Sequence, residues 1–297
     1  MSSFEVSLDQ DPLRLDADDV RATRRPLERA RTLPGRFYVE PAIFGVEIER
    51  IFSRRWVAAG REEDLPEPGS FLVRELGGES LLLARGEDGR ARAFYNVCRH
   101  RGTRLVEEPC GRRSRFRCPY HSWTYAPDGR LLNAPLMESH PDFEADDLPL
   151  RPERLESWHG FLFLHLDPHA SPLAEQLADL PDLERWSLAD LRRVERHEYD
   201  VEANWKVLSE NYGECYHCAL VHPQLHRISH YLSGGDQEQG HSFVGGPMTL
   251  NEGFDTMTHS GHSDRASLPG LSADDSDKVL YYDVYPNLLL SLHRDYV

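Results

Sequence analysis

The sequence contains no apolar run long enough to cross a membrane. A spanning helix needs about 18 consecutive apolar residues, and the longest candidates are short runs such as Gly160-Phe-Leu-Phe-Leu-His-Leu166. The N-terminal stretch Met1–Asp11 also lacks the basic segment followed by an apolar segment that marks a secretory signal. We therefore expect a protein without membrane contact and, by default, a cytoplasmic one.

Cysteine is sparse, with five among 297 residues, and the number is odd. A small secreted domain held by disulfides carries a denser and even set, so the count argues against a disulfide framework. Metal binding or burial remain as roles for Cys98, Cys110, Cys118, Cys215 and Cys218.

Positive charge is in short supply, since 34 Lys and Arg residues face 50 Asp and Glu residues and the net charge is -16. A surface of this sign repels phosphate backbones and anionic lipids, which argues against general nucleic-acid or membrane binding. Apolar residues still make up 39% and aromatic residues 10%. At about 150 residues per domain, the chain is long enough for two domains.

The N-terminal half of the chain separates into two regions. Residues 1–56 begin with an Asp-, Arg- and Pro-rich stretch that predicts a poorly ordered arm, and an apolar stripe over 41–56 then predicts a packed amphipathic helix. Residues 57–165 carry short β-like runs. Asp88-Gly89 and Asp128-Gly129 lie between such runs and predict tight hairpin turns.

The third region, residues 166–297, mixes helical and extended patterns. We expect an extended segment over 192–201 and a helix from Asn204 to about Ala219. A Ser-, Asp-, Gly- and His-rich stretch over 258–277 predicts a loop, and 281–293 has the pattern of a strand.

Two cysteines and two histidines have the spacing of metal ligands on two separate loops. Cys98-Arg-His100 is followed further along by Cys118-Pro-Tyr-His121. Two thiolates on one iron and two imidazoles on the other can hold a [2Fe-2S] cluster. Structural zinc sites usually take two like residues from each loop, whereas each loop here offers one of each. The spacing therefore favours the cluster over zinc.

The two loops resemble the cluster-binding loops of Rieske proteins, in the runs Asn96-Val-Cys-Arg-His-Arg-Gly102 and Cys118-Pro-Tyr-His-Ser-Trp-Thr-Tyr125. The resemblance implies a small β-sandwich that carries the cluster at its tip, with the iron bound by His100 and His121 nearest the surface. Cys110 matches no ligand position, and we expect it to be a small buried or loop cysteine.

An arginine-rich stretch surrounds these loops in an otherwise acidic chain. One hypothesis is that it steers an acidic electron-donor protein to the cluster. The alternative is that the charges are solvated or form ion pairs, including pairs between subunits. The residues are Arg99, Arg101, Arg104, Arg112, Arg113, Arg115 and Arg117.

A second group of possible ligands, Glu214, His217 and His222, lies in the predicted helix. Residues 214 and 217 share a helical face, but His217 and His222 are five residues apart, which is about 500° of helical rotation. The helix must therefore unwind before Pro223 if both histidines bind one metal.

This run resembles the acidic-x2-His-x4-His motif of Rieske non-haem iron oxygenases. The resemblance implies that His217 and His222 bind a mononuclear Fe(II), with positions left for dioxygen and substrate. It also implies that Glu214 links an iron-bound histidine to a cluster histidine of the neighbouring subunit in a head-to-tail homotrimer. Glu in a Glu-Cys-Tyr-His-Cys setting looks like the branch that oxidises quaternary ammonium compounds.

The third iron ligand is left unassigned. Family members place this acidic residue well downstream of the second histidine, and the available carboxylates do not match that position; they are Glu252, Asp283 and Asp295. Three explanations stay open: the chain is a fragment that lacks the C-terminal part, another polypeptide completes the site, or the mononuclear centre is impaired.

Other residues of the same run have less specific roles. Asn211, and less strongly Asn204, could hydrogen-bond near the metal or simply cap and face solvent. Cys215 and Cys218 flank His217, and we expect them to fill packing space. An aromatic group could line the pocket of a cationic substrate by cation–π attraction or fill the core: Trp205, Tyr212 and Tyr216.

Together these features predict an α+β protein with a Rieske β-sandwich domain and a helix-grip, antiparallel-sheet catalytic domain. The resemblance implies an oxygenase α subunit that receives NAD(P)H electrons through a reductase or ferredoxin and uses O2 to hydroxylate or N-demethylate a small substrate. We expect a quaternary amine as substrate. An aromatic ring-hydroxylating dioxygenase and a non-catalytic Rieske electron carrier are the alternatives.

Overall fold

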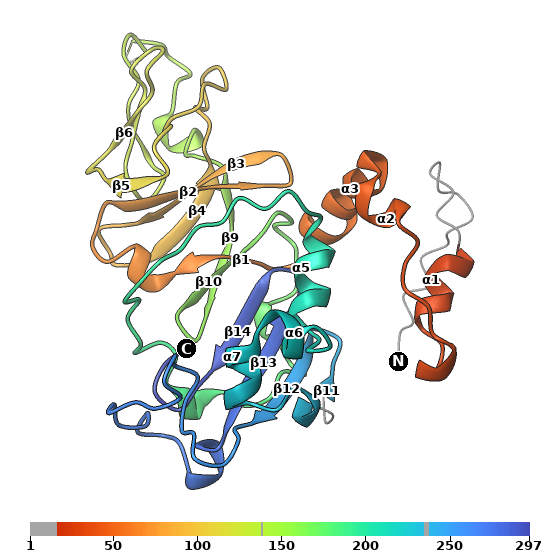
Figure 1. Cartoon of the computed structure of the whole chain (residues 1–297). Coiled ribbons are helices and arrows are strands. Elements are labelled where there is room, and N and C mark those ends of the chain that lie inside the picture. The colour runs from red at the N-terminus through yellow and green to blue at the C-terminus, as the bar shows by residue number, and fades with distance from the viewer. Residues whose placement is uncertain (1–16, 138, 235–237) are drawn as a thin grey trace.

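The computed structural model describes residues 17–137, 139–234 and 238–297. Residues 57–165 form two antiparallel sheets, at the upper left of Figure 1. The larger sheet has the strand order β1-β10-β9-β4-β3-β2-β5 and the smaller one the order β6-β7-β8. The strands are β1 Val57–Arg61, β2 Ser70–Leu76, β3 Glu79–Arg85, β4 Ala91–Tyr95, β5 Cys110–Arg112, β6 Phe116–Arg117, β7 Thr124–Tyr125, β8 Leu131–Asn133, β9 Pro152–Trp158 and β10 Phe161–His165.

Side chains on both faces of the larger sheet are buried. Phe71 and Val73 of β2 pack with the two loops that carry Cys98 and Cys118. Leu72, on the opposite face of β2, belongs to a second cluster with residues of β1, β3 and β10. Because side chains alternate between the two faces of a strand, the near-continuous apolar run of β2 is what a sheet covered on both sides requires.

The two predicted hairpin turns are present. Gly89 has φ 76° between β3 and β4, and Gly129 has φ 90° between β7 and β8. A Cβ atom at Gly129 would lie 2.4 Å from the ring of Phe94. Glycine is therefore required at this turn by both its dihedral angle and the neighbouring ring.

The second sheet is antiparallel, in the order β11-β12-β13-β14, with bounds Glu238–Gln239, Phe243–Thr249, Lys278–Val284 and Leu288–Leu292. The predicted single strand over 281–293 is wrong in detail: the chain turns at Tyr285–Asn287, and the run forms the hairpin of β13 and β14. Residues 258–277 carry one short helix, η8 (Ala273–Asp275), and otherwise form a loop as predicted. The predicted extended segment 192–201 forms no strand.

Helices α5 (Trp205–Tyr212), α6 (Cys218–Val221) and α7 (Pro223–Ile228) lie beside this sheet (Figure 1). The continuous helix predicted to about Ala219 is wrong, because α5 ends at Tyr212 with Gly213 as its C-cap. The Asn204 side chain accepts a hydrogen bond from the Lys206 backbone amide at 3.1 Å and is the N-cap of α5. Pro223 starts α7, a position that suits proline.

Part of the N-terminal helical region contacts α5. They are α1 Ala17–Thr23, η2 Leu27–Arg29, α2 Arg36–Val39, α3 Pro41–Glu47 and the π-helical turn η3 Ile48–Phe52. Glu47 accepts hydrogen bonds from Trp205 Nε1 at 2.9 Å and Lys206 Nζ at 2.5 Å, and the Phe52 and Trp205 rings are 5.3 Å apart. The predicted helix over 41–56 thus ends at Phe52. The predicted arm falls partly on residues 1–16, outside the described residues, and α1 gives its remainder regular structure.

A shared core joins the two sheet units. Trp56 and Phe163 pack in one cluster with residues of the second sheet, including Leu290. The short elements η4 Glu62–Asp64, η5 Ala145–Asp147, α4 Leu173–Gln176, η6 Glu184–Trp186 and η7 Tyr231–Gly234 complete the structure. The predicted α+β class, with a small β domain and a helix-plus-antiparallel-sheet domain, is confirmed. Within the described residues no helix is long and apolar enough to span a membrane.

Candidate metal centres

The two predicted cluster loops have the same backbone design. The Cys98 amide donates to the Thr103 carbonyl at 2.8 Å, and the Cys118 amide donates to the Trp123 carbonyl at 2.7 Å. Gly102 (φ 67°) precedes Thr103, and Ser122 (φ 62°) precedes Trp123; both have a positive φ. The backbone amide of each donates a hydrogen bond to the carbonyl of the cysteine in its own loop. Each loop is therefore a tight turn that fixes the direction of its cysteine.

These turns bring the four predicted ligands together. Cys98 and Cys118 are free thiols, buried at 3% and 2% exposure, whereas His100 and His121 are exposed. The two imidazole rings are 4.6 Å apart, and the Trp123 indole stacks on His100 with an interplanar angle of 8°. Buried thiols beneath exposed imidazoles fit a [2Fe-2S] cluster with its histidine-bound iron at the surface.

Tyr125 supports the cysteine side of this site. Its hydroxyl lies 3.4 Å from Cys98 Sγ and accepts a hydrogen bond from the Arg99 amide at 3.0 Å. Burial, together with the hydrogen bond to Cys98, raises the pKa of Tyr125, so the hydroxyl keeps its proton and can donate it toward sulfur. Tyr125 is part of the predicted cluster motif, but its contact with the sulfur of Cys98 was not predicted.

Electrostatics favour the neutral form of His100. Desolvation, followed by the nearby positive charges of His121 and Arg101, lowers the pKa of His100. A metal ligand must be deprotonated at the binding nitrogen. The lowered pKa therefore suits a histidine that binds iron.

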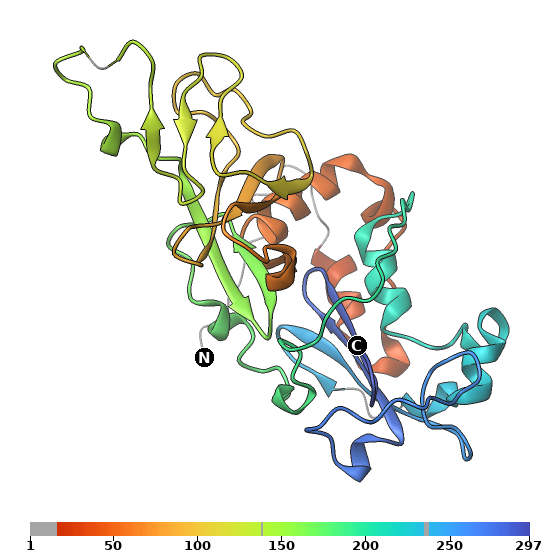
Figure 2. The ribbon, with the colours of Figure 1, turned by 90° about the vertical axis from the view of Figure 1, so that its left-hand side faces the viewer.

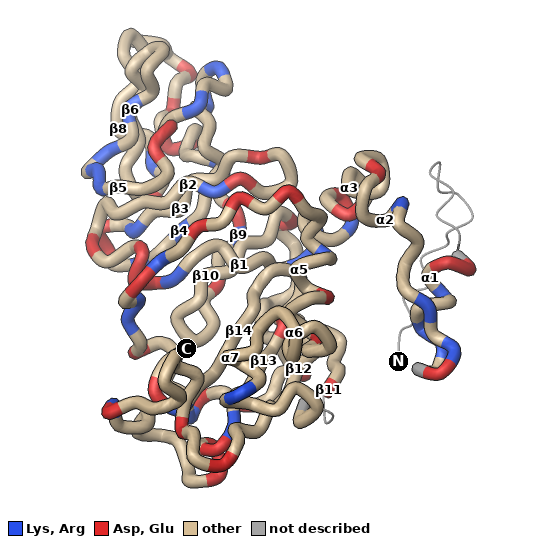
Figure 3. Tube along the Cα trace, in the orientation of Figure 1, with Lys and Arg blue, Asp and Glu red and all other residues tan. Residues whose placement is uncertain are grey.

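The arginine-rich stretch is largely neutralised by glutamates. Arg112 Nη1 lies 2.6 Å from Glu67, Arg113 Nη2 lies 2.6 Å from Glu108, and Arg104 pairs with Glu75. Figure 3 shows basic residues (blue) beside acidic residues (red) around β5 and β6. Among the described residues, Arg99, Arg101, Arg115 and Arg117 form no ion pair, and Arg117 donates a hydrogen bond to Ser122 Oγ at 2.7 Å.

His217 and His222 flank the short helix α6 and line one cavity of about 430 Å³. Their rings are 5.2 Å apart with an interplanar angle of 76°. The chain unwinds at residues 213–217 and again at His222, so two histidines that a straight helix would separate face the same space. The predicted need for unwinding is confirmed, although the main break lies earlier than expected.

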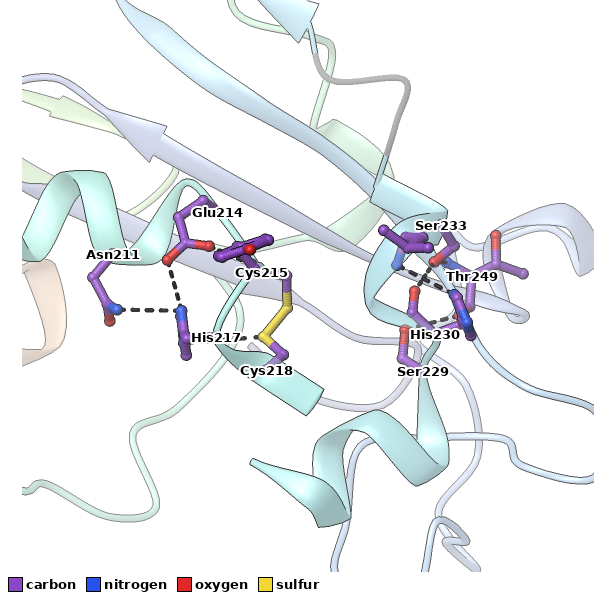
Figure 4. The surroundings of a disulfide bond; sticks show 11 residues. Asn211, Glu214, Cys215, His217, Cys218, Ser229, His230, Ser233 and Thr249 are labelled. Atoms are coloured by element: carbon purple, nitrogen blue, oxygen red, sulfur yellow. Dashed lines mark hydrogen bonds and ion pairs between the residues drawn. A yellow bond between two sulfur atoms is a disulfide. The ribbon is translucent and has the colours of Figure 1, made fainter. Parts of the chain in front are cut away.

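Glu214 contacts His217 although no helix places them on a common face. Glu214 Oε1 lies 2.7 Å from His217 Nδ1, and Glu214 Oε2 accepts a hydrogen bond from the Tyr216 amide (Figure 4). Asn211 Nδ2 lies 3.4 Å from the same Nδ1. Since Glu214 accepts a hydrogen bond from Nδ1, Nε2 is the nitrogen of His217 that is left for a metal.

Glu214 is ionised in this setting. Desolvation opposes its negative charge, but hydrogen bonds from His217 and the Tyr216 amide outweigh desolvation and lower the pKa of Glu214. A carboxylate at Nδ1 fixes the tautomer and orientation of a metal-binding histidine. Glu214 is 45% exposed at its side chain, so its outer edge also faces solvent.

The cavity corrects the predicted aromatic lining. Tyr212 lines it, as do Tyr231 and Tyr281, which the sequence analysis did not identify. Tyr216 points away, with 91% exposure. Trp205 is held by Glu47 and Phe52 at the start of α5. Of the two roles left open for this group, the pocket lining therefore applies to Tyr212 and not to Trp205 or Tyr216.

The carboxylates considered for the third ligand are used elsewhere. Asp283 is buried and accepts a hydrogen bond from Ser209, and desolvation raises its pKa. Asp295 binds Thr256 and Arg265 at 2.8 Å and 3.0 Å, and Glu252 is exposed. Among described residues no three His, Cys, Asp or Glu side chains converge as ligands of one ion. A [2Fe-2S] cluster would take two ligands per iron from the four cluster residues, and His217 and His222 would supply two ligands to a mononuclear iron.

Cys215 and Cys218 form a disulfide, so the expectation that they only fill packing space is wrong. Their Cα atoms are 5.0 Å apart across the turn between α5 and α6, within the usual range for a disulfide. The count of cysteines did not reveal the pair because the turn at residues 213–217, rather than a helix, is what brings them together.

Comparison with known proteins assigns the class. Residues 55–149 match the model of the Rieske [2Fe-2S] domain, and residues 188–297 match that of the ring hydroxylating alpha subunit catalytic domain. The chain belongs to the Rieske non-haem iron oxygenases, whose cofactors are a [2Fe-2S] cluster and a mononuclear iron.

Individual relatives come from two branches. The chain is 37% identical over 216 residues to the carnitine monooxygenase oxygenase subunit of Escherichia coli strain K12, covering 70% of this chain and 58% of that protein. It superposes on the quaternary ammonium Rieske monooxygenase CntA with TM-score 0.74 and 26% identity, covering 89% and 69% of the two chains. Naphthalene 1,2-dioxygenase from Rhodococcus sp. gives TM-score 0.69 and 26% identity, covering 88% and 64%. The chain thus spans just over half the length of the carnitine enzyme.

Proposed function

We propose that this chain is the oxygenase subunit of a Rieske monooxygenase that hydroxylates or N-demethylates a quaternary ammonium compound. The observation that carries the proposal is the pair His217 and His222 in one aromatic-lined cavity, with Glu214 on the far nitrogen of His217. The similarity to carnitine monooxygenase and to CntA supports the substrate class.

Each site residue has a separate task in this proposal. Cys98, Cys118, His100 and His121 hold the cluster, and His217 and His222 hold the mononuclear iron with a carboxylate that we leave unassigned. The bound metals supply one-electron storage and oxygen activation. The Rieske domain is taken as residues 57–165, because β9 and β10 lie in the same sheet as β4 and β1, with 1–56 and 166–297 forming the catalytic part.

The cavity suits a cation whose charge is spread over methyl groups. Tyr212, Tyr231 and Tyr281 offer aromatic faces, and cation–π attraction favours a quaternary ammonium group there. No Lys or Arg is found among the described residues that line the cavity. A trimethylammonium head is therefore attracted by the rings and meets no lining cation. Asn211 is a close neighbour of His217 in this proposal, with its Nδ2 at 3.4 Å from Nδ1.

Electrons pass between copies of the chain in this proposal. Figures 1 and 2 show the cluster loops beside β6 at one end of the molecule and α6 toward the other. Glu214 is partly exposed beside Tyr216 and Leu220, which are 91% and 90% exposed. A head-to-tail homotrimer, which is a closed heterologous ring, would cover this apolar surface and bring a neighbour's His100 or His121 toward Glu214.

The remaining partners follow from the same class of reaction. A reductase or ferredoxin supplies electrons that originate from NAD(P)H, O2 is the co-substrate, and a cytoplasmic location suits such partners. The similarity to naphthalene 1,2-dioxygenase supports aromatic ring hydroxylation as the second candidate function. A non-catalytic electron carrier has no use for the cavity that His217 and His222 line.

Oxygen uptake in the presence of a reductase separates these functions. We expect uptake and product formation with trimethylammonium compounds and none with simple aromatic acids; the reverse would favour the ring dioxygenase. His217→Ala should abolish turnover and leave the cluster's electron paramagnetic resonance spectrum unchanged. Turnover that survives this change would overturn the proposal.

A further inference from the structure

A disulfide brackets one of the two histidines of the mononuclear site. Cys215 and Cys218 lie on either side of His217 in sequence, and Cys218 Sγ is 4.0 Å from His217 Nε2 (Figure 4). This is the nitrogen that Glu214 leaves for a metal. The disulfide therefore adjoins the position where the iron would bind.

The disulfide can be reached by small reagents. Both cysteines line the cavity of about 430 Å³, and Cys215 is partly exposed while Cys218 is buried. Disulfides in a reducing compartment are usually transient, catalytic or redox-sensing rather than structural. A reachable pair in the Cys-x-x-Cys arrangement has the features of a reversible one.

We propose that Cys215 and Cys218 form a thiol–disulfide switch that sets the order of the turn carrying Glu214 and His217. The inference rests on the proposed function of His217 as an iron ligand. Oxidation joins the two sulfurs, and two electrons and two protons pass to one molecule of glutathione disulfide, which becomes two of glutathione. A hydroperoxide serves equally, leaving as an alcohol and water.

The disulfide stabilises the turn that aims His217. His217 is the N-cap of α6 and Cys218 is its first residue, so the cross-link ties the start of α6 to the irregular segment after α5. Opening the link gives this segment more freedom. Chain entropy for a loop of about four residues predicts that the reduced form binds Fe(II) at this site up to about twentyfold more weakly.

A glutathione redox titration of the whole holoprotein tests the switch itself. Samples equilibrated without oxygen at different ratios of glutathione to its disulfide are trapped with N-ethylmaleimide, digested and analysed by mass spectrometry. We expect the peptide holding Cys215 and Cys218 to change between two thiols and one disulfide in a single reversible transition. A pair that stays reduced in pure glutathione disulfide, or that only forms glutathione adducts, would overturn the proposal.

Cys110 provides the internal control, because it is an exposed free cysteine in the other sheet unit. It should form only mixed adducts with glutathione. This titration does not depend on turnover, so its result is independent of the proposed activity.

Iron release tests the effect on His217. We expect a chelator to remove the mononuclear iron severalfold faster from protein reduced with a phosphine than from oxidised protein. Cys215→Ser should release iron at the faster rate in both conditions, and Cys110→Ser should behave like the parent protein. Equal rates in the parent would overturn the coupling to His217. Absence of this iron from both forms would contradict the proposed function instead, and the titration would still decide the switch.

Discussion

Glu214 Oε1 lies 2.7 Å from Nδ1 of His217, across a turn in which neither residue belongs to a helix. The carboxylate is ionised and partly exposed, whereas the other imidazole nitrogen lies in the cavity region. Glu214 thus contacts a candidate iron-binding histidine and also reaches the outer surface, as the proposed electron transfer between subunits requires.

Replacing Glu214 by Gln should separate electron transfer from metal binding. Gln keeps a hydrogen bond to His217 but loses the charge, so we expect both metal centres to assemble while oxidation of the reduced cluster by the second site slows by about a hundredfold or more. Stopped-flow absorbance of the cluster measures this rate. Glu252→Gln, an exposed glutamate elsewhere, is the matched control and should react at the parent rate.

The contact should also respond to pH in a definite direction. The pKa of Glu214 is lower in the folded protein than in the unfolded chain. The ionised carboxylate therefore stabilises the folded state above the unfolded-state pKa of Glu214, and this stabilisation is lost as pH falls through its folded-state pKa. The cluster-oxidation rate should therefore decrease in acid more steeply in the parent than in Glu214→Gln. Parallel pH profiles would show that another group controls the rate.

Tyr125→Phe should lower the reduction potential of the cluster. The hydroxyl 3.4 Å from Cys98 Sγ stabilises the more electron-rich reduced form, and a hydrogen bond to charge of about 1.5 kcal/mol corresponds to roughly 60 mV for one electron. Spectroelectrochemistry measures the shift. Tyr120→Phe, beside His121 but 61% exposed, is the control, and an equal shift there would contradict the assignment.

His293 should make the fold sensitive to acid. It is buried with an unpartnered Nδ1, and desolvation lowers the pKa of His293 from 6.5 to about 4. A buried neutral histidine favours folding above the unfolded pKa, and stability is lost as pH falls from about 6.5 toward 4, by up to about 3 kcal/mol. Urea unfolding at pH 7 and pH 4.5 should show a smaller loss for His293→Gln; an unchanged loss would point to other groups.

Ionic strength should have little effect on reduction by an electron donor. Arg104, Arg112 and Arg113 are paired with glutamates, so the surface near the cluster carries less net positive charge than the sequence suggested. Only a shallow decrease in the reduction rate with added salt is expected. A steep decrease, removed by Arg101→Gln, would support steering by the unpaired arginines instead.

Short-range patterns predicted the parts of the molecule that depend on local chemistry. The Cys-x-His and Cys-x2-His spacing around Cys98 and Cys118 predicted the cluster loops, and each loop closes within a few residues at its own positive-φ residue, Gly102 or Ser122. The Asp-Gly turns at Gly89 and Gly129 were predicted for the same reason. In these places the geometry depends on a few consecutive residues, which the sequence displays directly.

Features that depend on distant contacts were missed. The strand Phe243–Thr249 contains Gly245-Gly246-Pro247, a pattern that argues against a strand, and pairing with β13 overrides it. The sequence left Trp205 either in the substrate pocket or in the core, and Glu47, far away in sequence, holds its indole at the start of α5. The cavity residues Tyr231 and Tyr281 come together only through tertiary folding.

Iron and acid-labile sulfide per purified chain, measured for the parent and for His222→Ala, test the two-centre account most directly. The account predicts about three irons for two sulfides in the parent and about two for two in His222→Ala, with the reduced-cluster electron paramagnetic resonance spectrum preserved in both. Two irons for two sulfides in the parent itself would contradict the assignment of His217 and His222 as a mononuclear iron site.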